Sequence, residues 1–219
     1  MSARRHPEST VGIVLAMIAA LLSGGGATAS AHEPKAPASP AEIVAYHDSG
    51  EWDADTTGVI RRARRQLSRH LTDHRPALVL DVDDTSLSSY DCLEAAGFDR
   101  EKAQCQAAPA IGQTRDLYRY ARAHGAVVFF VTGRRARMRA ATVDALHAAG
   151  YEGTLHLRLR PNRQAPGAYA GWKARTRRAI ERRGYTIVAN VGDQRSDLIG
   201  GAALRAFKLP NPMYVIAKA

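Results

Sequence analysis

The feature that most constrains the fold is an apolar run that ends in a pair of aspartates. Residues 77–80 read Ala-Leu-Val-Leu, and Asp81, Val82 and Asp83 follow directly. A near-continuous apolar run of this length predicts a strand that is buried on both faces of a parallel sheet. Ligands of open α/β sheets bind at the carboxyl ends of the strands, so the run predicts a site that contains both aspartates.

Polar side chains stand in the same position in three later segments. Thr132 and Gly133 close a second apolar run, and Asp193 follows another, with Asp197 one helical turn further on. Lys173 lies near the start of a predicted helix, where the helix dipole favours an anion. Thr132 or Asp197 alone would fit an ordinary strand end or a helix surface. Because all of these residues follow one another at strand ends or near a helix start, the sequence predicts one site that combines carboxylates, a hydroxyl and an ammonium group.

The hydrophobic pattern predicts strands that alternate with helices. Strands are expected at residues 77–83, 126–132, 154–160, 186–191 and 205–209, and helices at 57–74, 112–124, 136–149 and 170–183. Such alternation favours an α/β fold in which helices cover both faces of a parallel sheet. About forty residues separate the first two strands, and about forty more separate the second strand from Lys173. Neither interval has room for a large lid domain.

The order and wording of these motifs resemble the haloacid dehalogenase-like (HAD) superfamily. The segments DVDDTSLSSYD, VTGR, WK, GDQRSDL and FKLPNPMYVI are similar to its subfamily IIIB acid phosphatases, which include class B bacterial acid phosphatases, plant acid phosphatases and vegetative storage proteins. The resemblance covers residues 41–216. It implies a HAD-like Rossmannoid three-layer sandwich with a mainly parallel sheet, only small cap insertions and an open site.

The resemblance also implies an activity, the hydrolysis of phosphate monoesters through an aspartyl-phosphate intermediate. A carboxylate can attack phosphorus and hold the phosphoryl group briefly, and the resemblance assigns this role to Asp81. It assigns the general acid and base to Asp83. It also assigns phosphate binding to Thr132 and Gly133, and makes Lys173 the cation that neutralises the nucleophile and the transferred group.

A dianionic ester approaches an aspartate only if its charge is screened. Mg²⁺ suits a site with few carboxylates and a phosphate oxygen, and the expected ligands are Asp81 and Asp193. The family pattern adds the main-chain carbonyl of Asp83. Asp197 is expected to contact the metal directly or through its outer shell.

At two positions the residue differs from the one that is common in the family. Trp172 stands where relatives often carry Tyr, and Arg195 stands where plant relatives often carry Trp. Both are expected at the rim of the site, where they would affect substrate preference.

The first 31 residues predict a secretory signal peptide, and hence a secreted protein. Arg4 and Arg5 precede an apolar stretch over residues 11–22, and small residues lead to a cleavage site after Ala31. The arginine pair leaves twin-arginine export open beside the general secretory route. The apolar stretch is too short to span a bilayer comfortably, so no membrane span is expected.

The remaining chain is expected to form one domain over residues 41–219, after a Pro-, Ala- and Ser-rich disordered lead-in at 32–40. Cys92 and Cys105 are the two cysteines of the chain. In an oxidising compartment they predict one disulfide, and the alternative is two separate buried thiols.

The chain is strongly basic, with a formal net charge of +10. Most of the positive charge comes from arginines on predicted helices, and the simplest interpretation is that they form solvated outer faces. The alternative is a field that attracts anionic substrates or polyanions. Residues in these runs include Arg61, Arg62, Arg64, Arg65, Arg69, Arg175, Arg177 and Arg178.

Two rival functions remain beside the phosphatase. One is a noncatalytic storage-type relative, although such proteins have lost the nucleophile and Asp81 is present here. The other is a basic polyanion-binding protein, which the lack of aromatic residues within the arginine runs disfavours. No stable nucleic-acid partner is therefore expected. Small phosphate monoesters are the expected substrates, with nucleotides among the candidates, and the sequence leaves the oligomeric state open.

Overall fold

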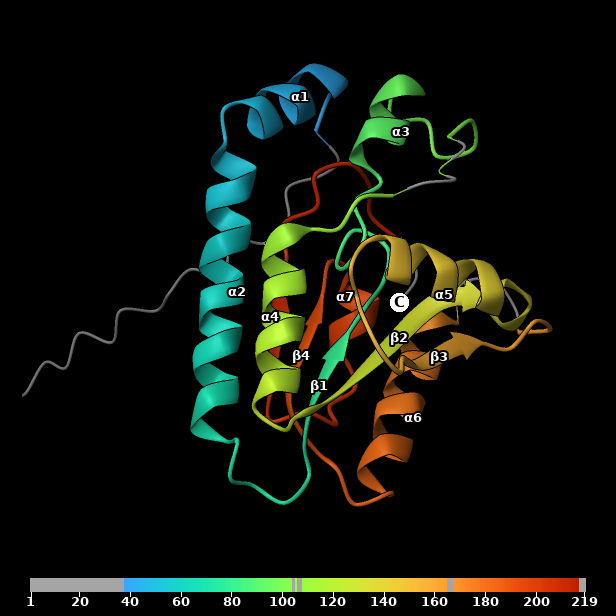
Figure 1. The fold of residues 1–219 in the computed structure, drawn as a ribbon. Helices are drawn as coiled ribbons and strands as arrows, with labels where there is room; N and C mark the ends of the chain where they lie inside the picture. Colours follow the sequence, from blue (N-terminus) through green and yellow to red (C-terminus); the bar gives the residue numbers. More distant parts are fainter. Residues whose placement is uncertain (1–37, 104, 106–107, 165–167, 217–219) are drawn as a thin grey trace, which may run out of the picture. The chain divides into compact units, whose positions relative to one another are not determined.

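The apolar run before Asp81 forms the central strand of a five-stranded parallel sheet. The computed structural model describes residues 38–103, 105, 108–164 and 168–216, all within one compact unit that runs from Glu33 to Ala219. The strands pair in the order β3-β2-β1-β4-β5 (Figure 1). They are β1 (Pro76–Leu80), β2 (Val127–Arg135), β3 (His156–Arg160), β4 (Thr186–Gly192) and β5 (Arg205–Lys208).

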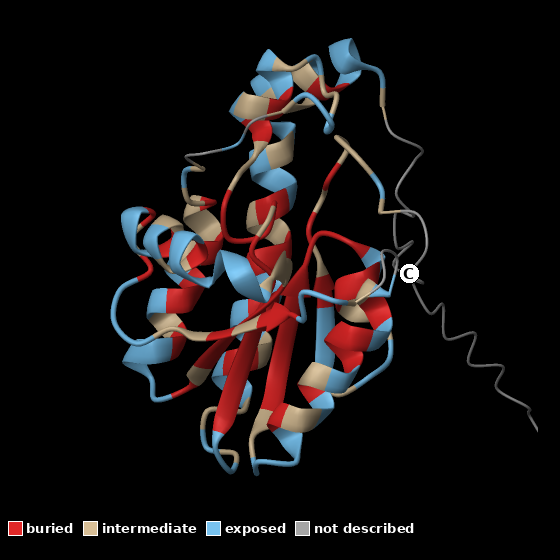
Figure 2. Ribbon diagram, turned by 90° about the vertical axis from the view of Figure 1, so that its right-hand side faces the viewer, coloured by how far each residue is buried: buried red, intermediate tan, exposed pale blue. Residues whose placement is uncertain are grey.

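The burial of the strands explains why the sequence shows runs rather than alternation. Every residue of β1 is buried, as are six of the seven residues of β4, and Figure 2 shows the centre of the sheet as buried. A strand covered on both faces needs apolar side chains on both. The α/β class and the parallel sheet predicted from the sequence are confirmed.

Helices cover both faces of the sheet and make a three-layer arrangement. One hydrophobic cluster joins the sheet to α2, α4 and α5, and a second joins the other face to α6. The helices are α1 (Pro40–Asp48), α2 (Glu51–Arg69), α3 (Tyr90–Ala95), α4 (Gly112–Ala123), α5 (Arg139–Ala148), α6 (Tyr169–Glu181) and α7 (Arg195–Leu198), with a 3₁₀ turn, η1 (Ala136–Met138), before α5.

The helix predicted at residues 57–74 begins six residues earlier than expected, at Glu51, and ends at Arg69. Ile60, Ala63 and Leu67 on its inner face are buried. The start was misplaced because Gly50, with φ of 78°, turns the chain sharply out of α1, and Glu51 then opens α2. Acidic side chains in a first helical turn complement the helix dipole.

Helix α1 was not predicted, although the sequence carries its start signal. The Ser39 side chain accepts a hydrogen bond from the N–H of Glu42, the Glu42 carboxylate accepts one from the N–H of Ser39, and Pro40 occupies the first turn. This is a capping box, in which two backbone donors are satisfied reciprocally. Residues 1–37 lie outside the described part of the chain, and with them the predicted signal peptide and most of the lead-in.

The segment between β1 and β2 carries a small insertion rather than a lid domain. It contains α3, the cystine and α4. Cys92 and Cys105 form a disulfide with a Cα–Cα distance of 5.4 Å, so the alternative of two separate thiols is wrong. Among the described residues, no helix is long and apolar enough to cross a membrane.

We expect the disulfide to stabilise the domain by restricting the unfolded chain. Replacing both cysteines by serine (Cys92→Ser with Cys105→Ser) should lower the free energy of unfolding by about 3 kcal/mol, the chain-entropy value for a loop of this length. Urea denaturation measures the loss. Reducing agent should produce a similar loss in the parent protein and none in the double variant, and equal stability of the reduced and oxidised parent would contradict the prediction.

Candidate active site

Asp81 lies at the point where the strand order of the sheet reverses. From β1 the chain builds outward to β2 and β3, then returns to pair β4 on the other side of β1. The N–H of Asp81 donates to the carbonyl of Val191 at 3.0 Å, which extends the pairing of β1 with β4 by one residue. Crevices at such reversals bind the ligands of open α/β sheets. Asp81 is 6% exposed and lies at this reversal.

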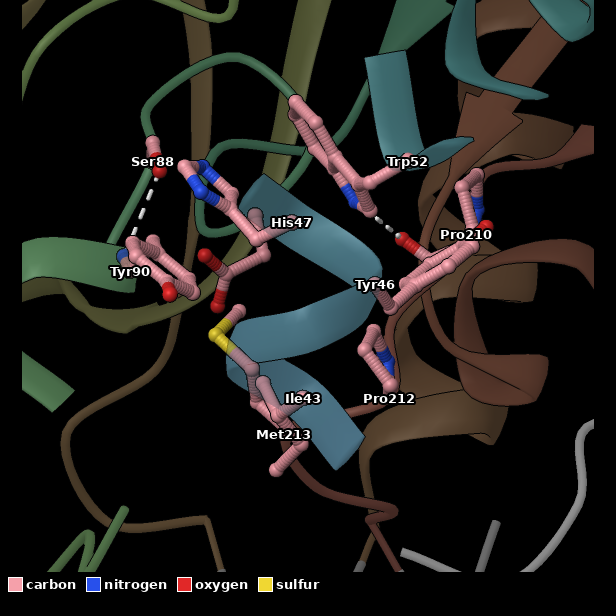
Figure 3. Close-up of a pocket in the computed structure, with 10 residues that line it drawn as sticks. Ile43, Tyr46, His47, Trp52, Ser88, Tyr90, Pro210, Pro212 and Met213 are labelled. Carbon is pink, nitrogen blue, oxygen red and sulfur yellow. Dashed lines mark hydrogen bonds between the residues drawn. The ribbon is translucent and has the colours of Figure 1, made fainter. Parts of the chain in front are cut away.

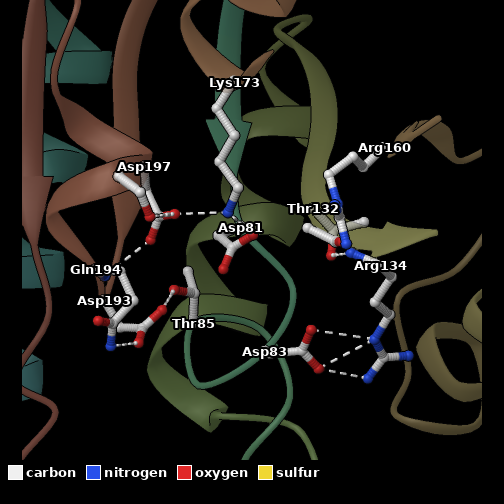
Figure 4. A network of polar contacts seen from close by, with 12 residues as sticks. Asp81, Asp83, Thr85, Thr132, Arg134, Arg160, Lys173, Asp193, Gln194 and Asp197 are labelled. Atoms are coloured by element: carbon white, nitrogen blue, oxygen red, sulfur yellow. Dashed lines mark hydrogen bonds and ion pairs between the residues drawn. The ribbon is translucent and has the colours of Figure 1, made fainter. Parts of the chain in front are cut away.

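Lys173 of α6 joins two buried carboxylates. Its Nζ donates to Oδ1 of Asp81 at 2.7 Å and to Oδ1 of Asp197 at 2.5 Å (Figure 4). Burial opposes the charge of the lysine, but the two carboxylates outweigh it and raise the pKa of the ammonium above its usual value. Lys173 therefore stays charged and neutralises part of the negative charge around Asp81.

Three buried aspartates come together beside this lysine. Asp81, Asp193 and Asp197 each offer an oxygen within 4.8 Å of the others. Burial raises the pKa of Asp193 to about 7, with the Asp197 carboxylate adding to the shift. Burial also raises the pKa of Asp81, together with Asp197 and Asp193, although Lys173 opposes it.

One ammonium does not balance three carboxylates. Buried anions need a compensating cation, and carboxylate oxygens are the donors that hard divalent cations prefer. The chemistry of this donor set fits a divalent ion at the predicted position. The carboxylate of Asp83 is not part of the cluster.

Polar side chains from three segments hold Asp193 in place. Its Oδ1 accepts from Thr85 at 3.1 Å, and its Oδ2 accepts from Gln194 at 2.7 Å and from Asn211 at 2.8 Å. These bonds leave few ways for the carboxylate to rotate. The bonds from Thr85 and Asn211 were not predicted, because these residues are far from Asp193 in the sequence.

Gly192 is required by the close approach of Asp197. A Cβ atom at Gly192 would lie 2.3 Å from Cβ of Asp197 and 2.6 Å from its Oδ2. The Gln194 N–H donates to the same Oδ2 at 2.8 Å. The glycine before Asp193 therefore lets the α7 carboxylate fold back against the end of β4.

Arg177 was predicted on a solvated helix face, and that prediction is wrong. The side chain is 1% exposed and donates to the carbonyls of Asp197 at 2.5 Å, Ile199 at 2.5 Å and Gly201 at 3.1 Å. The hydrophobic pattern could not reveal this, because the partners are backbone carbonyls in α7 and in the loop after it. Arg177 ties the loop after α7 to α6, four residues beyond Lys173.

Asp83 points to the other side of the crevice, where Arg134 binds it. The guanidinium donates from Nη2 to Oδ1 at 2.6 Å, and from Nε to Oδ1 at 3.0 Å and Oδ2 at 3.2 Å (Figure 4). The motif VTGR contained Arg134, but the sequence assigned it no role. Its position directly after the predicted phosphate-binding residues was the available signal.

Thr132 and Gly133 end the regular part of β2 beside this pair. Thr132 is fully buried, and its Oγ1 accepts from the N–H of Arg134 at 3.1 Å. The carbonyl of Gly133 accepts from Nε of Arg160 at 3.1 Å. A side chain at Gly133 would crowd the ring of Tyr169, with its Cβ 3.1 Å from a ring carbon. The predicted residues thus reach the same sheet edge as Asp81.

The segment after β5 also contacts the site. Asn211 binds Asp193, the Tyr214 hydroxyl donates to the buried Asp84 carboxylate, and the N–H of Ile216 donates to Gln194 at 2.9 Å. Burial raises the pKa of Asp84, while hydrogen bonds from Ser89 and Tyr214 oppose the shift. The C-terminal motif FKLPNPMYVI therefore supports the acidic loops from outside the sheet.

An aromatic pocket lies beyond Asp84, between α1 and the C-terminal segment (Figure 3). The His47 ring stacks on Tyr90 with 3.6 Å between centroids, and Trp52 donates to the carbonyl of Pro210 at 3.3 Å. These contacts join α1 and α2 to the two segments that frame the site.

Trp172 does not lie at the rim, contrary to prediction. It is 9% exposed and packs with Phe129, Val131 and Ile180 in the second hydrophobic cluster. Its neighbour Lys173 faces the aspartates, and adjacent helical residues point in different directions. Arg195 is exposed.

The fold and this site define an α/β protein of the haloacid dehalogenase-like class. The chain belongs to the HAD superfamily, subfamily IIIB (acid phosphatase), whose sequence model matches residues 25–217. The resemblance inferred from the motifs is confirmed.

Two plant relatives illustrate the breadth of this family. Acid phosphatase 1 of Solanum lycopersicum is 36% identical over 155 residues, which cover 66% of this chain and 60% of that protein. Vegetative storage protein 1 of Arabidopsis thaliana is 30% identical over 148 residues, which cover 63% of this chain and 54% of that protein. The chain thus matches little more than half the length of these relatives, one named a phosphatase and one a storage protein.

A solved structure has the same fold. The class C acid phosphatase from Bacillus anthracis superposes with a TM-score of 0.65 at 21% sequence identity, and the match covers 81% of this chain and 86% of that one. The two chains therefore share a fold over most of their lengths.

We expect Arg177→Met to destabilise the domain. The change removes a donor from three carbonyls, of which that of Asp197 keeps Nδ2 of Asn190, and a buried polar group that loses its partner costs about 1–3 kcal/mol. A total loss of roughly 3 kcal/mol in the free energy of unfolding is expected. Arg178→Met is the matched control, because Arg178 is exposed and bonds one carbonyl, that of Gly200. Equal stability of the two variants would contradict the prediction.

Proposed function

We propose that the protein is an exported, Mg²⁺-dependent acid phosphatase that hydrolyses phosphate monoesters through an aspartyl-phosphate intermediate. The observation that carries the proposal is the buried Asp81 carboxylate, bonded to Lys173 and grouped with Asp193 and Asp197 at the strand-order reversal. A nucleophile, a fixed ammonium and a divalent-cation donor set at one crevice are what phosphoryl transfer to a carboxylate requires.

In the first step Asp81 attacks the phosphorus atom of the ester. A bond forms between the Asp81 carboxylate and phosphorus as the bond to the leaving oxygen breaks, and the protonated Asp83 carboxyl gives its proton to that oxygen. Lys173 and the hydroxyl of Thr132 stabilise the phosphoryl oxygens, together with the amide of Gly133. The alcohol then leaves.

In the second step water removes the phosphoryl group. The Asp83 carboxylate takes a proton from the water as its oxygen bonds to phosphorus, and the bond between phosphorus and Asp81 breaks. Inorganic phosphate leaves, Asp81 is again a carboxylate, and Asp83 is again protonated.

Asp81, Asp193 and Asp197 would hold the metal, together with the main-chain carbonyl of Asp83. Mg²⁺ bound there supplies positive charge that offsets the charges of the ester and of the attacking carboxylate. Lys173 keeps Asp81 and Asp197 in position whether or not an ester is bound, because both of its contacts lie within the protein.

The storage-type alternative has a specific observation in its favour, the plant relatives named as storage proteins. The presence of Asp81, bonded to Lys173 and grouped with Asp193 and Asp197, supports catalysis instead. Export is supported by the disulfide, since such bonds persist in oxidising compartments. Small esters, nucleotides among them, are the proposed substrates.

We expect Mg²⁺ to stabilise the protein as well as to activate it. At a concentration about 100 times its Kd, Mg²⁺ should raise the Tm of metal-free protein by roughly 5–10 °C. Asp193→Asn should lose most of this shift, and the exposed Asp144→Asn should keep it. Chelation should abolish phosphate release and Mg²⁺ should restore it, so full activity in verified metal-free protein would refute the metal assignment.

We expect the two aspartates of the first motif to differ in their dependence on the leaving group. A nitrophenolate leaves without protonation, whereas an alkoxide needs a proton. Asp83→Asn should therefore lose roughly 10²- to 10⁴-fold more rate on an alkyl phosphate than on p-nitrophenyl phosphate. Asp81→Asn should disable hydrolysis of both.

The comparison divides the rate loss on the alkyl phosphate by the rate loss on p-nitrophenyl phosphate. Partial misfolding lowers both rates by the same factor, so it cannot produce a change in this ratio. Pre-steady-state phosphate release shows whether chemistry limits the rate, because a burst marks slow dephosphorylation. With rate-limiting chemistry, equal losses of Asp83→Asn on both esters would mean that Asp83 is not the acid.

A further inference from the structure

The Asp83 carboxylate is fixed by one residue. Arg134 supplies every hydrogen bond recorded for that carboxylate within the described residues, three in all at 2.6–3.2 Å. The Asp83 side chain is 44% exposed, against 8% for Asp81. A carboxylate this open would sample several rotamers without a partner. A planar guanidinium that contacts both oxygens fixes its orientation as well as its distance.

Arg134 is itself held by the strand that carries the predicted phosphate-binding residues. Its N–H donates to Oγ1 of Thr132 at 3.1 Å, and its Nη1 reaches Oγ1 of Thr142 at 3.5 Å. The pairing of β2 with β3 shifts register between Thr132 and Arg135. Such an irregularity turns successive side chains to new directions, and bulges of this kind often lie next to active sites.

Arg134 links the predicted phosphate-binding residue Thr132 to the predicted general acid Asp83, a contact that the sequence did not predict. Thr132 lies at the end of β2, Asp83 lies in the loop after β1, and Arg134 joins them across the two strands. The orientation of the acid is thereby set relative to the group that binds the phosphoryl oxygens.

We propose that Arg134 is a positioning residue that aims the Asp83 carboxyl at the leaving oxygen of the ester. The inference rests on the proposed phosphatase function and deepens it. Arg134 acts through Asp83, and the planar two-oxygen contact rather than the positive charge alone is what the acid step needs. The side chain is 18% exposed, so most of it is packed against the protein rather than free in solvent.

The test compares Arg134→Gln and Arg134→Lys with the parent on an alkyl phosphate and on p-nitrophenyl phosphate. Both variants should lose roughly 10-fold or more rate on the alkyl ester beyond their loss on the nitrophenyl ester, because general acid help is worth about 10²- to 10⁴-fold. Lysine keeps the charge but not the planar fork. A lysine variant with the parent's ratio of rates would overturn the proposal.

A double-mutant comparison adds a readout that a structural role would not change. In an Asp83→Asn background the acid is already absent, so Arg134→Gln should change the ratio of rates on the two esters by less than about 2-fold. A further leaving-group-selective loss in that background would overturn the proposal, because Arg134 would then act independently of Asp83.

A matched control separates positioning from charge. Arg137→Gln removes one positive charge at an exposed position three residues away. It should keep the parent's ratio of rates, and a selective loss in Arg137→Gln equal to that of Arg134→Gln would overturn the proposal. If the parent hydrolyses neither ester, the proposed function fails. If Asp83→Asn is leaving-group selective and the Arg134 variants are not, only this inference fails.

Discussion

The site depends first on the Lys173 ammonium between two buried carboxylates. Asp81 follows β1 and Asp197 belongs to α7, so the lysine of α6 joins three elements at one point. Burying one ammonium with several carboxylates is unfavourable unless the charges are paired and hydrogen-bonded. The surrounding structure satisfies this condition through backbone and side-chain donors, and the excess of negative charge makes the cluster receptive to a divalent cation.

The supports of this ion pair come from segments that are distant in the chain. Arg177 fixes the loop after α7, Gly192 leaves space for Asp197, and Asn211 restrains Asp193. None of these residues needs to touch an ester. Their common effect is to keep the acidic groups in one arrangement, which would lower the cost of reorganising them when charge moves during the proposed phosphoryl transfer.

The crevice has a second, more open side. Asp83 and Arg134 form an ion pair at the edge of the site, partly exposed to solvent, whereas Asp81 and Lys173 are buried. The division suits the proposed chemistry, because the phosphoryl group must be shielded while the leaving alcohol must depart. The small insertion between β1 and β2 leaves this side uncovered by any lid domain within the described residues.

The sequence by itself determined the α/β class, the parallel sheet and the strand-end positions of Asp81, Thr132 and Asp193. It could do so because buried strands demand apolar runs, and because a polar residue that directly follows such a run must lie at the sheet edge. The helix ends were less well predicted, since Gly50 and the Ser39 cap decide them locally. Only the tertiary structure decided that Arg177 is buried, that Trp172 belongs to the core, and that Arg134 binds Asp83. Those outcomes depend on which distant backbone and side-chain groups come into contact after the strands pair. The hydrophobic periodicity of one segment carries no information about such contacts.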